Sequence, residues 1–187
     1  MTRFIDRGAI AAAFIGIGVA LTVGISFLLV IPVEPVYALL ALPSGMLIGY
    51  YANSRAGRDG GPWSRVLANS VVAGLLTAAT MALLLLAVKA LFFSADDGYR
   101  DPGLGGRIFC ETGADCVYRR YLEAQGAELA AAGVTDAATF SRFYWDQQLA
   151  TAGSIATLAI AGALAGGIAF GATRGRARRA VDGPAGS

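Results

Sequence analysis

Four stretches of this chain are long and apolar enough to predict membrane-crossing helices. They cover residues 8–31, 36–52, 66–93 and 149–173, and the only charged residue within them is Lys89. A helix rises about 1.5 Å per residue, so about 20 apolar residues cross a hydrocarbon core of about 30 Å. None of the four shows the two-residue alternation of a strand. The pattern predicts an all-α integral membrane protein, built as a four-transmembrane-helix bundle.

The composition supports this class and excludes several kinds of chemistry. Hydrophobic residues make up 56% of the chain and charged residues 15%, whereas soluble domains carry about 25% charged residues. The chain has no histidine, the commonest general base and metal ligand, so a Ser-His-Asp hydrolase is excluded. The first apolar run follows a basic start but is longer than the 7 to 15 residues typical of a signal peptide, so we expect an uncleaved helix.

The distribution of charges predicts the orientation. With four crossings, the N-terminus, the 53–65 loop and the segment after residue 173 share one side and together hold nine arginines and three aspartates. The opposite side consists of Glu34 and residues 94–148, with ten acidic residues and five arginines in all. Because arginine and lysine are enriched in cytoplasmic loops, we expect a multi-pass protein of the inner (plasma) membrane with both termini cytoplasmic.

This topology divides the chain into four parts. Residues 1–93 are expected to form three spans preceded by a cytoplasmic N-terminus, and residues 149–173 the fourth span. Residues 94–148 are expected to form a small helical extracytoplasmic cap between the third and fourth helices. Residues 174–187 are expected to be a disordered basic cytoplasmic tail.

Both cysteines, Cys110 and Cys116, belong to the expected cap and would face an oxidising compartment. Their spacing allows a small ring, in which Gly113 can supply a turn, so we predict a structural disulfide between them. Closing so short a loop stabilises a folded chain by about 2 to 3 kcal/mol at most. After it, the sequence predicts a helix that Gly133 ends, and then a helix that Thr135 or Asp136 caps and that continues into the fourth span.

Small residues recur at four-residue intervals in every span, which predicts close packing of helix backbones. Lipid tails provide no hydrophobic drive for helix association, so close approach and dispersion must provide it. We expect these residues at helix contacts, with one spare row left for self-association: Gly8, Ala12, Gly16, Ala20, Gly24, Ala41, Gly45, Gly49, Ser70, Gly74, Ala78, Ala82, Gly162 and Gly166.

The charged residues suggest few sites. Lys89 lies four residues from the outer end of its span, where its long stem can carry the ammonium group to the headgroups, although an intramembrane charge can also mark a transport path. The run Asp96, Asp97 and Asp101 fails the EF-hand spacing and is typical of a turn, so no metal and no cofactor are expected. Anionic lipid is an expected partner of the basic tail at Arg174, Arg176, Arg178 and Arg179, and nucleic acid is not.

A four-span protein with outer cysteines is similar in architecture to the quinone-linked disulfide-generating enzymes of the bacterial inner membrane. Those enzymes need two thiol pairs, one of them C-x-x-C, and this chain has one pair of wider spacing. The function we expect is therefore non-catalytic: an accessory, scaffold or interaction protein that contacts another membrane protein or a second copy of itself. A small transporter or channel subunit is the first alternative, and a thiol–disulfide redox protein is the second.

Overall fold

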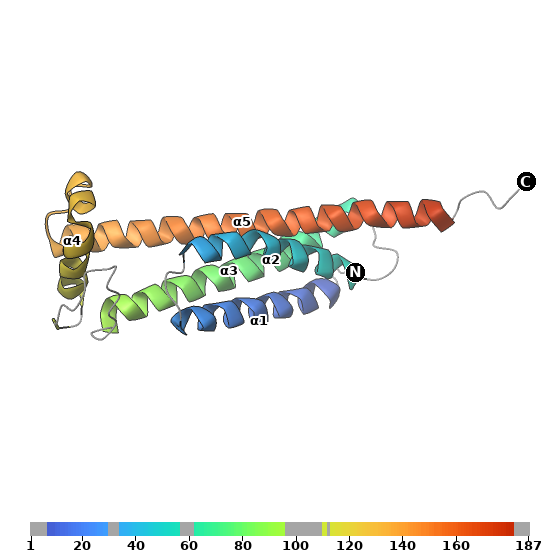
Figure 1. Ribbon diagram of the computed structural model, residues 1–187. Helices are drawn as coiled ribbons and strands as arrows, with labels where there is room; N and C mark the ends of the chain where they lie inside the picture. The colour runs from blue at the N-terminus through green and yellow to red at the C-terminus, as the bar shows by residue number, and fades with distance from the viewer. Residues whose placement is uncertain (1–6, 30–33, 57–61, 96–109, 112, 182–187) are drawn as a thin grey trace, which may run out of the picture. The chain divides into compact units, whose positions relative to one another are not determined.

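The computed structural model describes residues 7–29, 34–56, 62–95, 110–111 and 113–181, and this part of the chain is all-helical (Figure 1). The all-α part of the predicted fold class is thereby confirmed. The helices of the described residues are α1 (Arg7–Leu29), α2 (Glu34–Ser54), α3 (Trp63–Ala95), α4 (Ala114–Ala131) and α5 (Ala137–Val181). Side chains are described for residues 7–22, 39–56, 62–94, 110–111 and 113–174.

Two helices are long and apolar enough to cross a membrane by length and composition. They are α3 over Trp63–Ser94 and α5 over Ala137–Arg174. The part of α1 with described side chains, Arg7–Thr22, is a shorter apolar helix, and that of α2 is also too short for the same test. The prediction of long apolar helices is therefore confirmed for α3 and α5, and membrane crossing by α1, α2, α3 and α5 stays a prediction.

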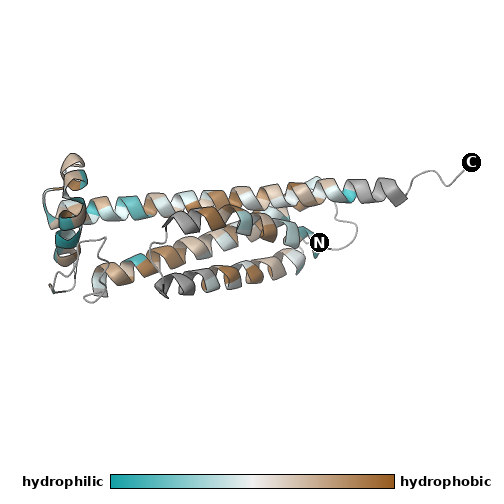
Figure 2. Ribbon diagram, in the orientation of Figure 1, coloured by the Kyte–Doolittle hydropathy of each residue, from teal (hydrophilic) through white to brown (hydrophobic). Residues whose placement is uncertain are grey.

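The chain divides into two compact units. Unit 1 comprises Met1–Leu84 and Gly153–Ser187, and unit 2 comprises Leu85–Ala152. Helices α3 and α5 contribute residues to both units, because the division falls within each of them. Figure 2 shows brown, hydrophobic residues along the helices of unit 1, whereas teal, hydrophilic residues gather on α4 and on the first turns of α5.

The helices of unit 1 alternate in direction, as close glycine contacts reveal. Gly8 at the start of α1 lies against Ala52 and Ala56 at the end of α2, so these two helices are antiparallel. Gly171 of α5 lies against Trp63 at the start of α3, so α3 and α5 are antiparallel as well. The start of α1, the end of α2, the start of α3 and residues 171–174 of α5 therefore share one end of unit 1.

In unit 2, the end of α4 and the start of α5 both follow from local sequence signals. Helix α4 ends in a Schellman motif, in which Val134 N donates to Leu129 O at 2.9 Å and Gly133 N donates to Ala130 O at 3.1 Å. Gly133 has φ 73°, a conformation that glycine adopts without steric cost, and it ends the helix as predicted. Near the middle of α4, Gln125 leaves helical geometry with φ −136° and ψ 30°, a break that the sequence did not indicate.

The start of α5 is also as predicted. The Thr139 N–H donates to Asp136 Oδ1 at 2.7 Å, and the Asp136 N–H donates to Thr139 Oγ1 at 3.1 Å, so Asp136 is the N-cap. The helix then runs without a break into the predicted fourth span and on to Val181. Residues 174–181, expected in a disordered tail, are therefore helical, because arginine and alanine are good helix formers that extend a helix already begun. Residues 182–187 lie outside the described part.

Candidate functional site: packing and polar surfaces

The closest backbone contact that the described glycines of unit 1 make joins α2 to α5. A Cβ added at Gly49 would lie 2.6 Å from the carbonyl carbon of Ala163, closer than real Cβ atoms approach other atoms, and one added at Gly45 would meet the Ala159 carbonyl in the same way. From the opposite side, Gly162 faces the Leu42 carbonyl and Gly166 faces the Met46 carbonyl. The two backbones thus touch along two turns of each helix.

The remaining small residues of the first three spans are placed as follows. In α1, Gly8, Ala12, Gly16 and Ala20 are all buried, with Gly8 against α2 and Gly16 against Thr77 of α3. In α2, Ala41 is buried, and in α3, Ser70, Gly74 and Ala78 are buried while Ala82 is half-buried. An added Cβ at Gly74 would lie 2.7 Å from Ala163 Cβ, so α3 also contacts α5. The surroundings of Gly24 lie outside the described residues.

A buried polar contact, which the sequence did not single out, joins α2, α3 and α5. The Asn53 amide donates to Ser70 Oγ at 2.8 Å and to Gly49 O at 2.9 Å, and Ser70 Oγ donates to Val66 O at 3.0 Å. Gly167 leaves room for this contact, because an added Cβ would meet Ser70 Oγ. The sequence places Asn53 in the 53–65 loop, directly after the second predicted span, so its role as an interhelical donor was missed.

The outward surface of unit 1 carries the large apolar side chains. Phe14 is 71% exposed, Leu39 73%, Leu47 71% and Leu83, at the end of the unit, 68%. The interior holds mostly alanine and glycine with some polar side chains, among them Asn53, Ser70 and Thr77. Soluble proteins show the reverse arrangement, with large apolar residues inside.

One further row of small residues lies on the outside of unit 1, on α5. We call it the outer α5 row; it consists of Gly153, Thr157, Ala161 and Ala165, all exposed. No described atom lies within 4 Å of a Cβ added at Gly153. The Thr157 hydroxyl donates to the Gly153 carbonyl at 2.8 Å, so its polar group is satisfied within its own helix. The row has the four-residue spacing of the internal contacts but faces away from them.

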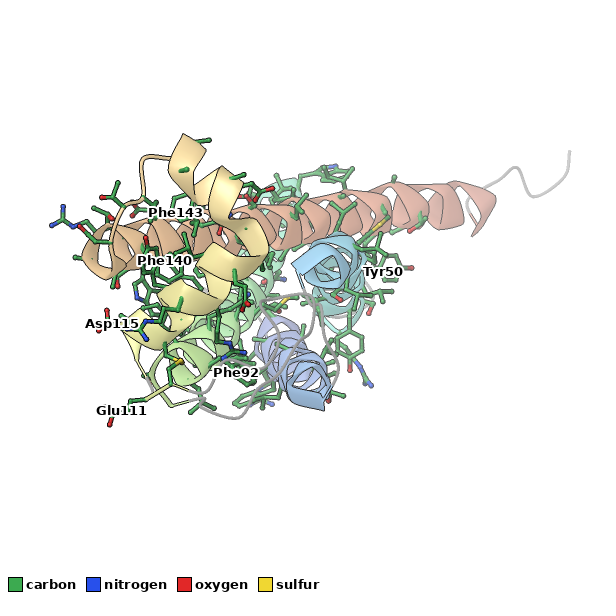
Figure 3. The ribbon with its side chains drawn as sticks, turned by 60° about the vertical axis from the view of Figure 1, so that its left-hand side comes forward. Tyr50, Phe92, Glu111, Asp115, Phe140 and Phe143 are labelled. Carbon is green, nitrogen blue, oxygen red and sulfur yellow. A yellow bond between two sulfur atoms is a disulfide. The ribbon has the colours of Figure 1, made fainter. Side chains whose placement is uncertain are left out.

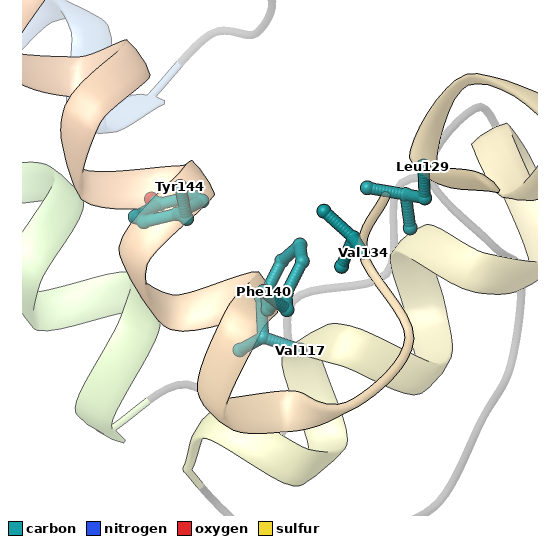
Figure 4. Packing of buried hydrophobic residues seen from close by; sticks show 5 residues of the cluster. All are labelled: Val117, Leu129, Val134, Phe140 and Tyr144. Atoms are coloured by element: carbon teal, nitrogen blue, oxygen red, sulfur yellow. The ribbon is translucent and has the colours of Figure 1, made fainter. Parts of the chain in front are cut away.

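Unit 2 has a small aromatic core of its own (Figure 4). Val117 and Leu129 of α4 pack with Val134, Phe140 and Tyr144. Aromatic rings extend this core in a continuous series of contacts, with centroid distances of 5.2 Å for Tyr121–Phe140 and 4.9 Å for Phe93–Tyr144. These contacts tie the last turns of α3 and the first turns of α5 to α4.

The two cysteines form the predicted disulfide, with Cα atoms 5.4 Å apart. Cys116 is buried in the first turn of α4, and Cys110 is half-buried. Gly113 lies between them with φ 130°, in the turn that it was predicted to be able to supply. Figure 3 shows Glu111 and Asp115 at the edge of this region; both are exposed. The predicted turn at Asp96, Asp97 and Asp101 lies outside the described residues, and among those described no cluster of potential metal ligands occurs.

Lys89 lies half-buried on α3, one turn before Phe93. The Phe93 ring contacts Tyr144 and Trp145, with its centroid 5.5 Å from that of Trp145. One turn further along α5 is Gln148, which is 2% exposed and whose amide oxygen has no hydrogen-bond partner among the described residues. Because α3 and α5 are antiparallel, Lys89 and Gln148 lie at the same level of the pair.

Among the described residues of unit 2, Asp136 has a shifted pKa. The backbone N–H of Thr139 donates to the Asp136 carboxylate, and this hydrogen bond lowers the pKa of Asp136 below its ordinary value. The group is exposed, so the effect is one of capping geometry and not of burial. It marks a helix start and no reactive site.

Comparison with models of known protein families, with curated proteins and with solved structures found no match to this chain.

Proposed function

We propose that α1, α2, α3 and α5 cross the inner (plasma) membrane, with both ends of the chain cytoplasmic and residues 94–148 outside. The support is the reversed distribution of side chains: large apolar residues such as Phe14 and Leu47 face outward, and small and polar residues face inward. Lipid solvates the first kind, and close backbone approach stabilises contacts of the second kind. An aqueous solvent would leave this apolar surface uncovered, at about 25 cal/mol per Å².

Within the membrane, we propose that the protein acts as a non-catalytic accessory or scaffold that associates through the outer α5 row. The observation that supports this proposal is that the outer α5 row has the same four-residue spacing as the internal contacts but faces outward. Hydroxyl groups along the helices donate to their own helix carbonyls, as Thr77 does to Ala73 O at 2.9 Å and Thr80 to Leu76 O at 2.8 Å. These groups are thereby satisfied in secondary structure, which suits a packing role.

The occupant we propose for the outer α5 row is a second copy of this chain. Native mass spectrometry from a mild detergent should give a dimer, and Ala161→Leu should weaken it about tenfold, because overpacking of a close contact costs about 1 to 3 kcal/mol. Ala79→Leu is the matched control, since Ala79 is exposed on α3. A monomer of wild-type protein at all concentrations, or equal weakening by both variants, would contradict the proposal.

A small transporter or channel subunit is the second candidate, and one observation favours it. Lys89 lies within the third predicted span, level with the buried Gln148 just before the fourth, and a charged group within a span is costly and tends to mark a path. Vesicles containing the protein should then pass protons or small ions, and Lys89→Met should abolish that flux. Flux that Lys89→Met leaves unchanged, or tight vesicles with wild-type protein, would remove this candidate.

A further inference from the structure

The end of unit 1 that is formed by the start of α1 and the end of α2 carries four arginines, of which Arg7, Arg65 and Arg174 lie in α1, α3 and α5 and Arg55 directly follows α2. Arg7 precedes Gly8, whose added Cβ would lie 2.8 Å from the carbonyl carbon of Arg55, so these two arginines are neighbours. Arg65 lies on the first turn of α3, and Arg174 follows Gly171, which contacts Trp63. We call this set, Arg7, Arg55, Arg65 and Arg174, the arginine end.

Aromatic side chains hold two of these guanidinium groups. The Arg55 guanidinium carbon lies 5.5 Å from the centre of the Tyr51 ring, and Arg55 Nε donates to the Tyr51 hydroxyl at 3.0 Å. The Arg174 guanidinium carbon lies 6.0 Å from the centre of the Trp63 ring. Stacking of this kind limits the rotation of a long side chain while leaving guanidinium N–H groups able to donate.

The arginine end includes every charged side chain of unit 1 that the structure describes, and all of them are positive. Arg7 and Arg55 are exposed, while Arg65 and Arg174 are half-buried. The exposed indole of Trp63 and the ring of Tyr50 lie at the same end, and such rings are enriched at headgroup level in membranes. Positive charge and interfacial aromatics thus coincide at one level.

We propose that the arginine end binds the phosphate groups of anionic phospholipids in the adjoining leaflet. This inference rests on the membrane placement proposed above and adds a partner to it. Guanidinium groups bind phosphate oxygens through paired, charge-assisted N–H donors. The exposed Arg7 and Arg55 offer such donors as neighbours, and Arg65 and Arg174 add positive charge at the same end. Bound headgroups would bridge helix ends, so anionic lipid also contributes to holding the bundle together.

Trp63 provides a direct probe, because the chain has two tryptophans and the other, Trp145, lies in unit 2. In a Trp145→Phe background, Trp63 fluorescence is measured in vesicles of phosphatidylcholine mixed with phosphatidylglycerol, with bromine on the acyl chains of one lipid at a time. Quenching should show phosphatidylglycerol enriched about fivefold around Trp63, the ratio that about 1 kcal/mol for one arginine–headgroup contact corresponds to.

The double variant Arg7→Gln/Arg55→Gln should bring this enrichment close to one. It leaves Trp63, the fluorescent probe, unchanged. Arg119→Gln/Arg142→Gln is the matched control, because it removes the same charge from exposed positions of unit 2 and should leave the enrichment unchanged. Equal enrichment of both lipids in the wild type, or equal loss in both double variants, would overturn the inference alone. Reversal by inorganic phosphate at constant ionic strength would assign the site to free phosphate. Absence of quenching by either lipid would overturn the membrane placement as well.

Discussion

The contact between α2 and α5 makes Gly49 the position where one methyl group should have the largest effect. In Gly49→Ala the new Cβ would lie 2.6 Å from the carbonyl carbon of Ala163 and 2.7 Å from its Cα, whereas ordinary contacts begin at 3.4 Å. The Ala163 carbonyl oxygen lies closer still, and because all three neighbours are backbone atoms, the helices must separate by at least about 0.8 Å. A gap of that size forfeits about a quarter to a half of the dispersion energy of each contact along the interface.

Overpacking of this kind costs about 1 to 3 kcal/mol, and it is offset by up to about 1 kcal/mol because alanine is the better helix former. Gly18→Ala is the matched control, since a Cβ at Gly18 meets no described atom within 4 Å. Both variants share the gain from alanine, so we expect Gly49→Ala to lie about 1 to 3 kcal/mol below Gly18→Ala in the free energy of unfolding. Denaturant titration in detergent micelles, followed by circular dichroism, measures both. Equal stability of the two variants would refute the close contact.

Three further changes address unit 2. Gly133→Ala should destabilise α4 by about 1 to 2 kcal/mol, because the φ of 73° is strained for alanine, and the Val134 amide should then exchange faster; unchanged exchange would argue against the Schellman motif. Cys110→Ala should lower the stability of unit 2 by about 2 kcal/mol in denaturant titration, through the lost loop closure, and a variant as stable as the wild type would contradict a structural disulfide. The lowered pKa of Asp136 means that its stabilising effect is present above the unfolded pKa of about 3.9 and is lost as the pH falls through the lower folded value. Protection of the Thr139 amide, measured as its exchange rate relative to that of an unfolded chain at the same pH, should therefore stay constant down to about pH 4 and fall below it, and Asp136→Asn should remove this dependence; a fall already at pH 6 would show that another group is responsible.

Local signals in the sequence predicted the local structure well. Gly133 as a helix stop, Asp136 as a cap and the continuous helix into the fourth span follow from interactions between residues close in sequence, so the spacing of residue types suffices. The break at Gln125 could not be predicted this way, because glutamine is compatible with a helix and the deviation depends on packing.

Which helices meet could not be predicted from the spacing of small residues. A row such as Gly45 and Gly49 shows that a backbone can be approached, but not whether α1, α3 or α5 approaches it. The same limit applies to Asn53, whose partner Ser70 lies on another helix. Charge counting indicated a basic side, yet the stacking of Arg55 and Arg174 on aromatic rings required the three-dimensional arrangement.

The central claim is that unit 1 crosses the membrane and that its arginine end lies on the cytoplasmic side. The most direct measurement uses single added cysteines, with the native disulfide left oxidised so that it does not react. Ser64→Cys at the start of α3 and Glu123→Cys on α4 are both at exposed positions. In intact cells a membrane-impermeant maleimide should label Glu123→Cys alone, and Ser64→Cys should react only after the membrane is opened. Labelling of both cysteines in intact cells, or of Ser64→Cys alone, would contradict the account.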